Sequence, residues 1–329
     1  MTETANELEL SVIVTVVSGR DALRENLRVL TIQMDEINGE LIVPYDKWSN
    51  DISDLAVEFP TVRFHLIEDL GLAFSSDVSA HQHRLYDRRR AVGLGLARGK
   101  IVAITEDHAR PSDDWCRQLI RLHIELPYEV IGGAVENGID RPINWAWYYC
   151  DFGRYGRPFS DGEAEYISDV NVSYKRQALA LVQDLCQETY SETTMHWALR
   201  EHGARLFLDG RLVVFQMRPA MSHLQALRER IAWGRVFAET RRMRLSAYKR
   251  PIFAAGAFIL PLILLFRVFR HMFRQTRTVT QVIQATPFVL FLLIGWSLGE
   301  MIGYLAGSPY AKAQGAGIAH SSGLIESQP

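Results

Sequence analysis

The chain is poor in cysteine and in net charge, and its first residues lack the apolar core that a leader would have. Three cysteines stand far apart among 329 residues, which excludes a disulfide framework and favours a reducing compartment. The 36 basic residues nearly balance the 38 acidic ones, so a general nucleic-acid binder is not expected and we predict no nucleic-acid partner. Residues 1–9 are acidic and have no apolar core, so we expect an N-terminal tail and no secretory signal peptide.

The chain does contain β-prone runs that alternate with helical patterns. Residues 10–17 form an almost unbroken apolar run, which is typical of a strand buried on both faces. Further strands are predicted over 40–44, 61–67, 101–105 and 128–135, and helices over 21–35, 84–97 and about 113–126. Strands that alternate with helices predict an α/β fold, a Rossmann-like and mostly parallel sheet flanked by helices.

The second half of the chain changes in character several times. Residues 140–165 are rich in aromatic side chains, glycine and proline, and we expect a loop or a short hairpin there. Mixed α/β patterning returns up to residue 222, and a basic linking helix is predicted within 223–250. The last stretch, 307–329, is rich in glycine, serine and alanine and is expected to be a disordered tail.

Two strongly apolar segments lie within 251–306, where we expect membrane-associated helices. Segment 285–306 reaches the length of about 20 residues that a spanning helix needs, whereas 252–266 is shorter, contains Pro261 and has arginines on both sides. We therefore expect 252–266 to be interfacial or re-entrant, with its basic flanks on the cytoplasmic lipid face. The alternative is a plain two-helix hairpin. Either arrangement places these segments in the plasma membrane and the preceding domain in the cytoplasm.

Acidic and imidazole side chains follow the predicted strand 101–105. Glu106 and His108 are two residues apart, so in extended chain both side chains lean to the same side. A carboxylate and an imidazole placed in this way can hold a divalent cation, and the cation can hold a diphosphate. Ligands of open parallel sheets bind beyond the carboxyl ends of the strands, which is where this pair is expected.

The motifs occur in a characteristic order over roughly residues 10–245. They are the strand 10–17, the run RRRAVGLGLARGK over 88–100, EDHARPSDDW over 106–115, NVSYKR over 171–176, and the block from Glu192 to Gly203 followed by a strand. This ordered set resembles the family-2 glycosyltransferases of the GT-A fold. The resemblance implies a GT-A domain over 10–222 that moves a sugar from a nucleotide-sugar donor to a lipid-linked or cell-envelope glycan acceptor, with inversion.

The resemblance also implies roles for individual residues. Glu106 and His108 occupy the positions of the family's Asp-x-Asp motif, whose side chains bind Mn²⁺ or Mg²⁺, and imidazole favours Mn²⁺. The residues expected to contact the nucleotide-sugar are Thr15, Asp46, Arg89, Arg90 and Asp107. Glu192 is the expected catalytic base. The family usually has aspartate at the next position, where this chain has Thr193, so either Glu192 takes that role or the acceptor needs no base.

Two other functions fit parts of the pattern. A GT-A-fold nucleotidyltransferase would carry a glycine-rich loop with Arg or Lys after its first strand, but the segment here, Ser18–Asp21, is short. A catalytically degenerate, membrane-bound transferase-like protein would explain the departures from the family at Tyr45, His108 and Thr193. A nucleotide-sugar hydrolysis assay with Mn²⁺ separates this alternative from an active enzyme.

Overall fold

The structure is a computed structural model that describes residues 8–70, 78–219, 221–242, 245–275 and 278–307. It divides into two compact units. The sheet unit contains residues 1–70, 84–220 and 274–276, and the helical unit contains residues 71–83, 221–273 and 277–329. The predicted tails 1–9 and 307–329 lie outside the described residues, apart from Leu8, Glu9 and Gly307. The predicted domain boundaries stay predictions.

Nine strands of the described chain form one sheet in the order β3-β2-β1-β4-β8-β6-β9-β5, with β7 paired to β9. The strands are β1 (Leu10–Thr15), β2 (Gly39–Tyr45), β3 (Arg63–Leu66), β4 (Ile101–Glu106), β5 (Ala109–Pro111), β6 (Val130–Asn137), β7 (Gly162–Glu163), β8 (Asn171–Lys175) and β9 (Leu206–Gln216). Strands β3, β2, β1, β4, β6 and β9 point one way, whereas β8, β7 and β5 point the other. The predicted α/β class and mostly parallel sheet are therefore confirmed.

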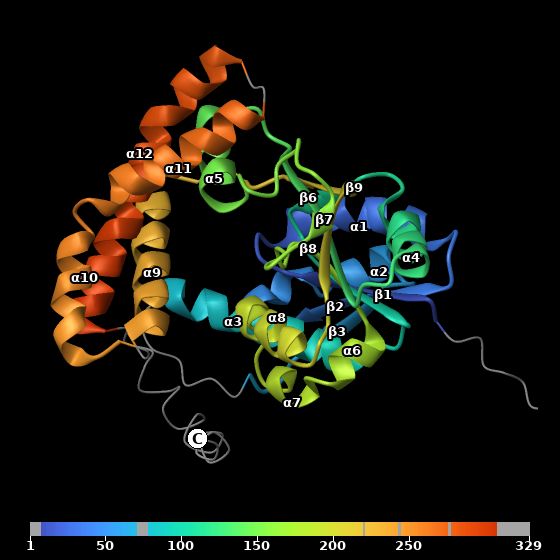
Figure 1. The fold of residues 1–329 in the computed structure, drawn as a ribbon. Coiled ribbons are helices and arrows are strands. Elements are labelled where there is room, and N and C mark those ends of the chain that lie inside the picture. Colours follow the sequence, from blue (N-terminus) through green and yellow to red (C-terminus); the bar gives the residue numbers. More distant parts are fainter. Residues whose placement is uncertain (1–7, 71–77, 220, 243–244, 276–277, 308–329) are drawn as a thin grey trace, which may run out of the picture. The chain divides into compact units, whose positions relative to one another are not determined.

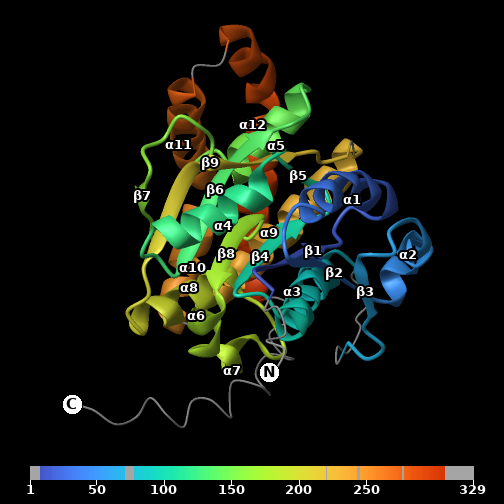
Figure 2. The same ribbon diagram turned by 90° about the vertical axis from the view of Figure 1, so that its right-hand side faces the viewer.

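Helices cover both faces of this sheet (Figures 1 and 2). In chain order they are α1 (Arg20–Met34), α2 (Leu55–Glu58), α3 (Val78–Leu96), α4 (Trp115–Glu125), α5 (Pro142–Asp151), α6 (Arg176–Ala180), α7 (Gln183–Cys186) and α8 (Glu192–Glu201), with a 3-10 turn over Lys47–Ile52. Side chains of α1 and α4 share a core with one face, and side chains of α3, α6 and α8 share a core with the other.

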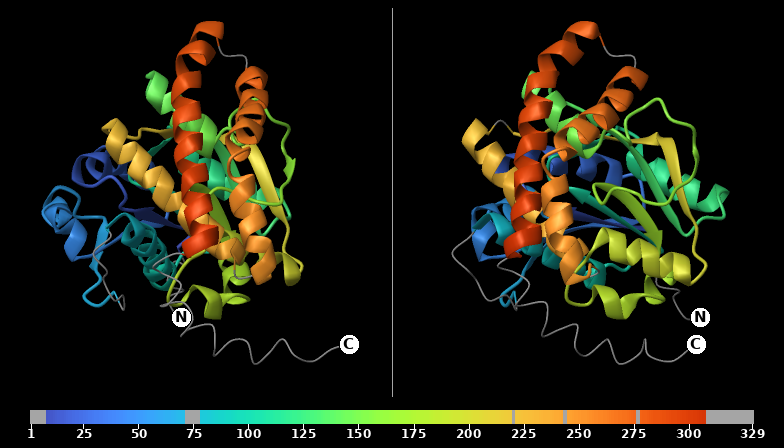
Figure 3. Two further views of the ribbon diagram at one scale, coloured as in Figure 1. Left: turned by 90° about the vertical axis from the view of Figure 1, so that its left-hand side faces the viewer. Right: turned by 60° about the vertical axis from the view of Figure 1, so that its left-hand side comes forward.

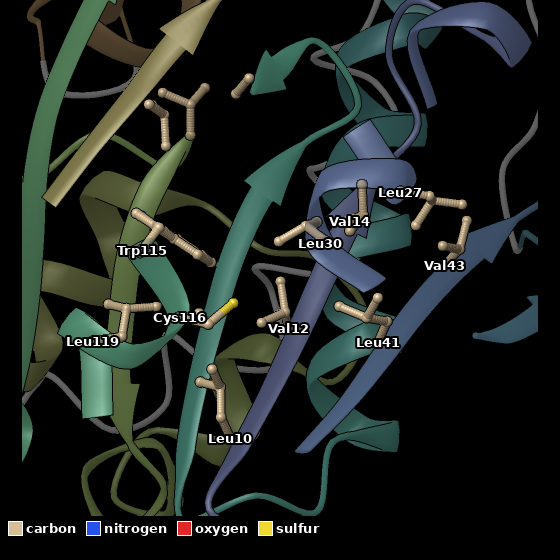
Figure 4. Close-up of a cluster of buried hydrophobic side chains, with 14 of the residues drawn as sticks. Leu10, Val12, Val14, Leu27, Leu30, Leu41, Val43, Trp115, Cys116 and Leu119 are labelled. Carbon is tan, nitrogen blue, oxygen red and sulfur yellow. The ribbon is translucent and has the colours of Figure 1, made fainter. Parts of the chain in front are cut away.

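Strand β1 shows why helices pack on both faces of the sheet. Leu10, Val12 and Val14 pack toward α1 and α4 in the cluster of Figure 4, while Ile13 packs into the core on the α3 side. Successive side chains of a strand point to opposite faces, so an unbroken apolar run buries both. Helix α3 comes close to β1 at Gly93, where a Cβ atom would collide with the Ile13 side chain.

The prediction of a loop or hairpin over 140–165 is wrong for the first part of that segment. Residues Pro142–Asp151 form helix α5, and only the two-residue strand β7 follows. Pro142 stands in the first turn, where its missing N–H costs no helical hydrogen bond. Trp145, Tyr148 and Tyr149 recur at helical spacing and are buried, so burial of one aromatic face favours the helix.

The helical unit contains α9 (His223–Arg242), a 3-10 turn (Ala247–Lys249), α10 (Arg250–Gly256), α11 (Leu260–Arg274) and α12 (Val279–Ala306). The predicted basic helix is present as α9. Figure 3 shows α12 in red beside α9 and α10. The α9–α12 contact is close because a Cβ atom on Gly234 would collide with the backbone of Trp296, and one on Gly299 with the backbone of Ile231. Such glycines let two helix backbones approach.

One helix of the described chain, α12, is long and apolar enough to span a membrane. Half of its most apolar stretch is buried, because α9 and α10 cover part of the helix. The segment predicted as interfacial or re-entrant is broken between α10 and α11 by a bend of 63°. Pro261 stands in the first turn of α11 and cannot donate a backbone hydrogen bond to the preceding turn. Whether this bent pair spans stays a prediction.

Candidate functional site

Three strand ends bring polar residues to one edge of the sheet. Strands β1 and β4 run parallel with Thr15 opposite Glu106, and the N–H of Asp107 donates to the Thr15 carbonyl at 2.9 Å. Strand β8 runs antiparallel to β4 with Thr105 opposite Asn171. The carboxyl ends of β1 and β4 therefore lie beside the residues that lead into β8, at the edge where open sheets bind ligands.

Glu106 and His108 face each other at this edge, as their spacing predicts. The Nε2 atom of His108 lies 3.3 Å from Oε2 of Glu106, and both side chains are buried. The Nδ1 atom of His108 lies 2.9 Å from the Ser18 hydroxyl and 3.2 Å from Oδ1 of Asp107. A proton on Nδ1 directed toward Asp107 leaves the Nε2 lone pair on the Glu106 side, which is the tautomer that a cation ligand needs.

Glu106 and His108 are a two-residue set. Among the residues that the structure describes, no group of three or more His, Cys, Asp and Glu side chains could hold a metal ion. Two ligands bonded to one cation at about 2.1 Å each, and at right angles, lie about 3 Å apart. The 3.3 Å separation of the Glu106 and His108 atoms fits that geometry, and the remaining ligands would have to come from solvent or from a bound molecule.

Asp107 contacts His108 through Oδ1 and also binds the backbone of the loop after β1. Its carboxylate accepts hydrogen bonds from the N–H groups of Val17, Ser18 and Gly19 at 2.8–2.9 Å. Gly19 has φ of +97°, a conformation that favours glycine, and α1 begins after it. Asp107 thus holds the loop between β1 and α1 against the end of β4. A contact between Asp107 and a nucleotide-sugar stays a prediction.

Asp46 and Arg89 are buried against each other. The Nε atom of Arg89 donates to Oδ2 of Asp46 at 2.8 Å, and the N–H of Trp48 donates to Oδ1 at 2.8 Å. Arg89 also donates to the Val16 carbonyl and to the Ser49 hydroxyl. The pair connects the end of β1 to the end of β2 and is shielded from solvent. Its role in this conformation is to hold the two strand ends that form the site at a fixed distance.

Thr15 lies at the same level, at the last position of β1. Its side chain is completely buried, and its hydroxyl has no hydrogen-bond partner within the described part of the chain. A buried hydroxyl without a partner is uncommon in folded proteins and calls for an explanation such as a bound ligand or water. The structure therefore leaves a polar atom available at the predicted position of Thr15.

Arg90 connects the carboxylates of the site. Its Nη2 atom lies 2.7 Å from Oε1 of Glu106 and 2.9 Å from Oδ2 of Asp169, and its Nη1 atom lies 3.3 Å from Oδ1 of Asp87. Burial lowers the pKa of Arg90, but the charges of Asp169, Glu106 and Asp87 outweigh burial and raise it. Arg90 is therefore a permanent cation among carboxylates that come from α3, β4 and the residues before β8.

Glu192 stands at the first position of α8, close to the same cluster. Its Oε2 atom accepts a hydrogen bond from the N–H of Asp169 at 3.3 Å. Burial, and then the charge of Asp169, raise the pKa of Glu192 from its ordinary value of 4.5 to about 8, although Arg154 opposes the shift. Glu192 therefore binds a proton through most of the neutral range.

The cluster contains more negative than positive charge. Burial raises the pKa of Glu106, while His108 and Arg90 oppose that shift and Asp169 adds to it. Burial likewise raises the pKa of Asp87. Burial and mutual repulsion both destabilise the charged form of these carboxylates. A bound cation offsets both effects, so the cluster favours binding one.

A buried hydrogen-bonded group lies behind the carboxylates. The Tyr174 hydroxyl lies 2.8 Å from that of Tyr190 and 3.1 Å from Nε2 of His196. Burial lowers the pKa of His196 to about 4, so its ring is neutral at physiological pH. The group connects β8 to α8 and to the Tyr190 ring, which lies 6.0 Å from the Arg90 guanidinium. It fixes α8, the helix that begins at Glu192, against β8.

Asp87 and Asp169 belong to the site but were not singled out from the sequence. Asp169 stands two residues before β8, and the antiparallel pairing of β8 with β4 brings it to Arg90. An acidic residue just before the NVSYKR motif was the available signal, but only the strand order of the sheet brings it to the site. Asp87 stands one helical turn before Arg90 on α3, a spacing that allows an ion pair.

No known protein-family model matches this sequence, and no curated protein matches it at a significant level. The function is therefore argued from the site.

Proposed function

We propose that this chain is a membrane-attached glycosyltransferase of the GT-A type, similar to the family-2 enzymes. It moves a sugar from a nucleotide-sugar donor to a lipid-linked or cell-envelope glycan acceptor. The observation that carries the proposal is the 3.3 Å approach of His108 Nε2 to Glu106 Oε2 at the carboxyl ends of β1 and β4. Metal-dependent enzymes of this type need a cation ligand set at that edge.

A divalent cation, Mn²⁺ or Mg²⁺, fits the residues present. Glu106 and His108 would hold it, Asp107 would fix the tautomer of His108, and the excess of carboxylates favours positive charge. When bound, such a cation stabilises the negative charge that develops on a departing diphosphate. Arg90, bonded to Glu106, adds a fixed positive charge beside the pair.

The other predicted residues have distinct positions in this proposal. Asp46, Arg89 and Asp107 hold the ends of β1, β2 and β4 together and so shape the donor pocket. Thr15 offers a buried hydroxyl to the nucleotide. Glu192, at the start of α8, faces the acceptor side.

Nucleotidyl transfer is a poorer fit. Such an enzyme needs free backbone N–H groups in the loop after its first strand to bind phosphates. Here the N–H groups of Val17, Ser18 and Gly19 are already bound by the Asp107 carboxylate. A catalytically degenerate protein would keep the same geometry without turnover. Measured activity would therefore exclude this alternative, and its absence would support it.

The membrane part of the proposal rests on the helical unit. Helix α12 crosses the plasma membrane with its first residues on the cytoplasmic side, where the sheet unit also lies. Helix α11 exposes Leu262, Ile263 and Phe266 together with Arg267 and Arg270. Apolar side chains beside arginines are typical of a helix that lies in the interface of an anionic bilayer. We therefore propose that the bent pair α10 and α11 is interfacial or re-entrant.

The test uses the full-length protein in detergent micelles. Its thermal unfolding is measured with UDP-, GDP- and TDP-sugars, in Mn²⁺ and in EDTA, and release of nucleoside diphosphate is then followed. We expect one donor class to raise the Tm in Mn²⁺ and to be hydrolysed slowly by water. A raised Tm without hydrolysis would favour the degenerate alternative, and no effect of any donor would refute the proposal.

A further inference from the structure

Two carboxylates lie close to the Glu106–His108 pair, and in the proposed function the acceptor binds beside them. Asp169 and Glu192 come from different elements, the approach to β8 and the start of α8, and the N–H of Asp169 donates to Glu192 at 3.3 Å. A hydroxyl acceptor must lose its proton as the new glycosidic bond forms. One of these two carboxylates can accept that proton.

The surroundings of the two carboxylates differ. The Asp169 carboxylate forms an ion pair with Arg90 at 2.9 Å, and a quarter of its side chain is exposed. Glu192 is protonated through most of the neutral range, because burial and Asp169 raise its pKa to about 8. A protonated carboxyl cannot accept the proton of an incoming hydroxyl.

The backbone holds Asp169 at a fixed position. Its neighbours Ser168 and Val170 are buried, the Val170 carbonyl accepts a hydrogen bond from the Thr105 hydroxyl at 3.0 Å, and its own N–H is bound by Glu192. The same nitrogen of Arg90 contacts both Asp169 and Glu106. Asp169 is thus fixed relative to the residue proposed to hold the cation, as a catalytic group must be.

We propose that Asp169, rather than Glu192, accepts the proton of a hydroxyl acceptor in the transfer reaction. This inference rests on the proposed function and names its acceptor class as a hydroxyl. The acceptor oxygen forms a bond to the anomeric carbon of the sugar as its O–H bond breaks and the proton passes to the Asp169 carboxylate. The bond from that carbon to the diphosphate breaks, and the nucleoside diphosphate leaves with the electron pair.

The test compares two nucleophiles in the full-length protein with the donor that binds. Water must be deprotonated when it attacks the sugar, whereas the azide anion needs no base. We expect Asp169→Asn to slow donor hydrolysis about 10²–10⁴-fold, the range for general-base catalysis, and to form the glycosyl azide at the wild-type rate with an unchanged Kd for the donor. The retained azide reaction also shows that the variant is folded.

Two matched variants sharpen the comparison. Asp87→Asn removes another carboxylate that contacts Arg90, so it should slow both reactions by the same factor, and Glu192→Gln should slow hydrolysis less than Asp169→Asn does. The proposal is overturned if Asp169→Asn loses both reactions equally, if it keeps hydrolysis, or if Glu192→Gln shows the larger selective loss. A wild-type protein that binds and hydrolyses no donor would overturn the proposed function as well, which separates the two failures.

Discussion

The Asp46 carboxylate lies 2.8 Å from the Arg89 guanidinium, and both side chains are sealed from solvent at the ends of β1 and β2. A buried ion pair of this kind is costly to break, since the remaining partner keeps an uncompensated charge. The main contribution of Asp46 and Arg89 is therefore to the stability of the folded site.

Asp46→Ala should destabilise the protein. It leaves Arg89 buried without its carboxylate partner, and we expect the free energy of unfolding to fall by about 3–5 kcal/mol. Thermal or denaturant unfolding without ligand measures the change. The exposed Asp51→Ala in the neighbouring turn is the matched control and should change stability by less than about 0.5 kcal/mol. If Asp46→Ala weakened only donor binding and left stability unchanged, Asp46 would act as a direct contact instead.

His108→Ala should weaken donor binding at least tenfold in Mn²⁺ and leave it unchanged in EDTA. The reason is that the imidazole acts through the cation, for which the described residues provide only Glu106 as a second ligand. Calorimetric titration with the donor, with and without Mn²⁺, makes the comparison. His202→Ala, a change of the same type at the exposed end of α8, should bind like the wild type. Equal binding by His108→Ala and wild type in Mn²⁺ would exclude His108 as a ligand.

The stability of the protein should fall as pH rises from about 4.5 to about 8 because of Glu192. Its pKa is raised from 4.5 to about 8 on folding, so across this window the folded state keeps a proton that the unfolded state has lost. The stabilisation is complete below pH 4.5 and is lost as pH rises through about 8. Glu192→Gln cannot titrate, so its Tm should fall less than that of the wild type between pH 5 and pH 9. Parallel Tm curves for the two proteins would contradict the raised pKa.

Cysteine labelling tests the membrane arrangement. An impermeant maleimide applied to intact cells should label Leu305→Cys, at the end of α12, and should not label Thr280→Cys, at its start. Labelling of Thr280→Cys would establish the two-helix hairpin. Absence of labelling at both positions would show that α12 does not cross the membrane and instead lies with the charged helix α9 that covers it. The native cysteines lie in the sheet unit and should stay unlabelled in the parent protein.

Much of the fold follows from local patterns. The apolar run that begins at Leu10 predicted a strand buried on both faces, and its alternating side chains do pack into two cores. The aromatic segment around Trp145 was misassigned because its composition resembles a loop, whereas burial of its helical face decided the structure. The antiparallel β8 was also not foreseen, since strand direction depends on the path of the chain between strands.

The sequence by itself predicted that Glu106 and His108 would meet at the end of a strand, and they do, although His108 lies in the turn between β4 and β5 rather than in extended chain. Tertiary structure decided the environment of every other group in the site. Arg89 reaches Asp46 from 43 positions away, and Asp169 joins Arg90 only because β8 lies next to β4 in the sheet. Local spacing does not encode packing between distant segments. That packing determines how far each carboxylate of the site is exposed to water and whether an arginine lies against it.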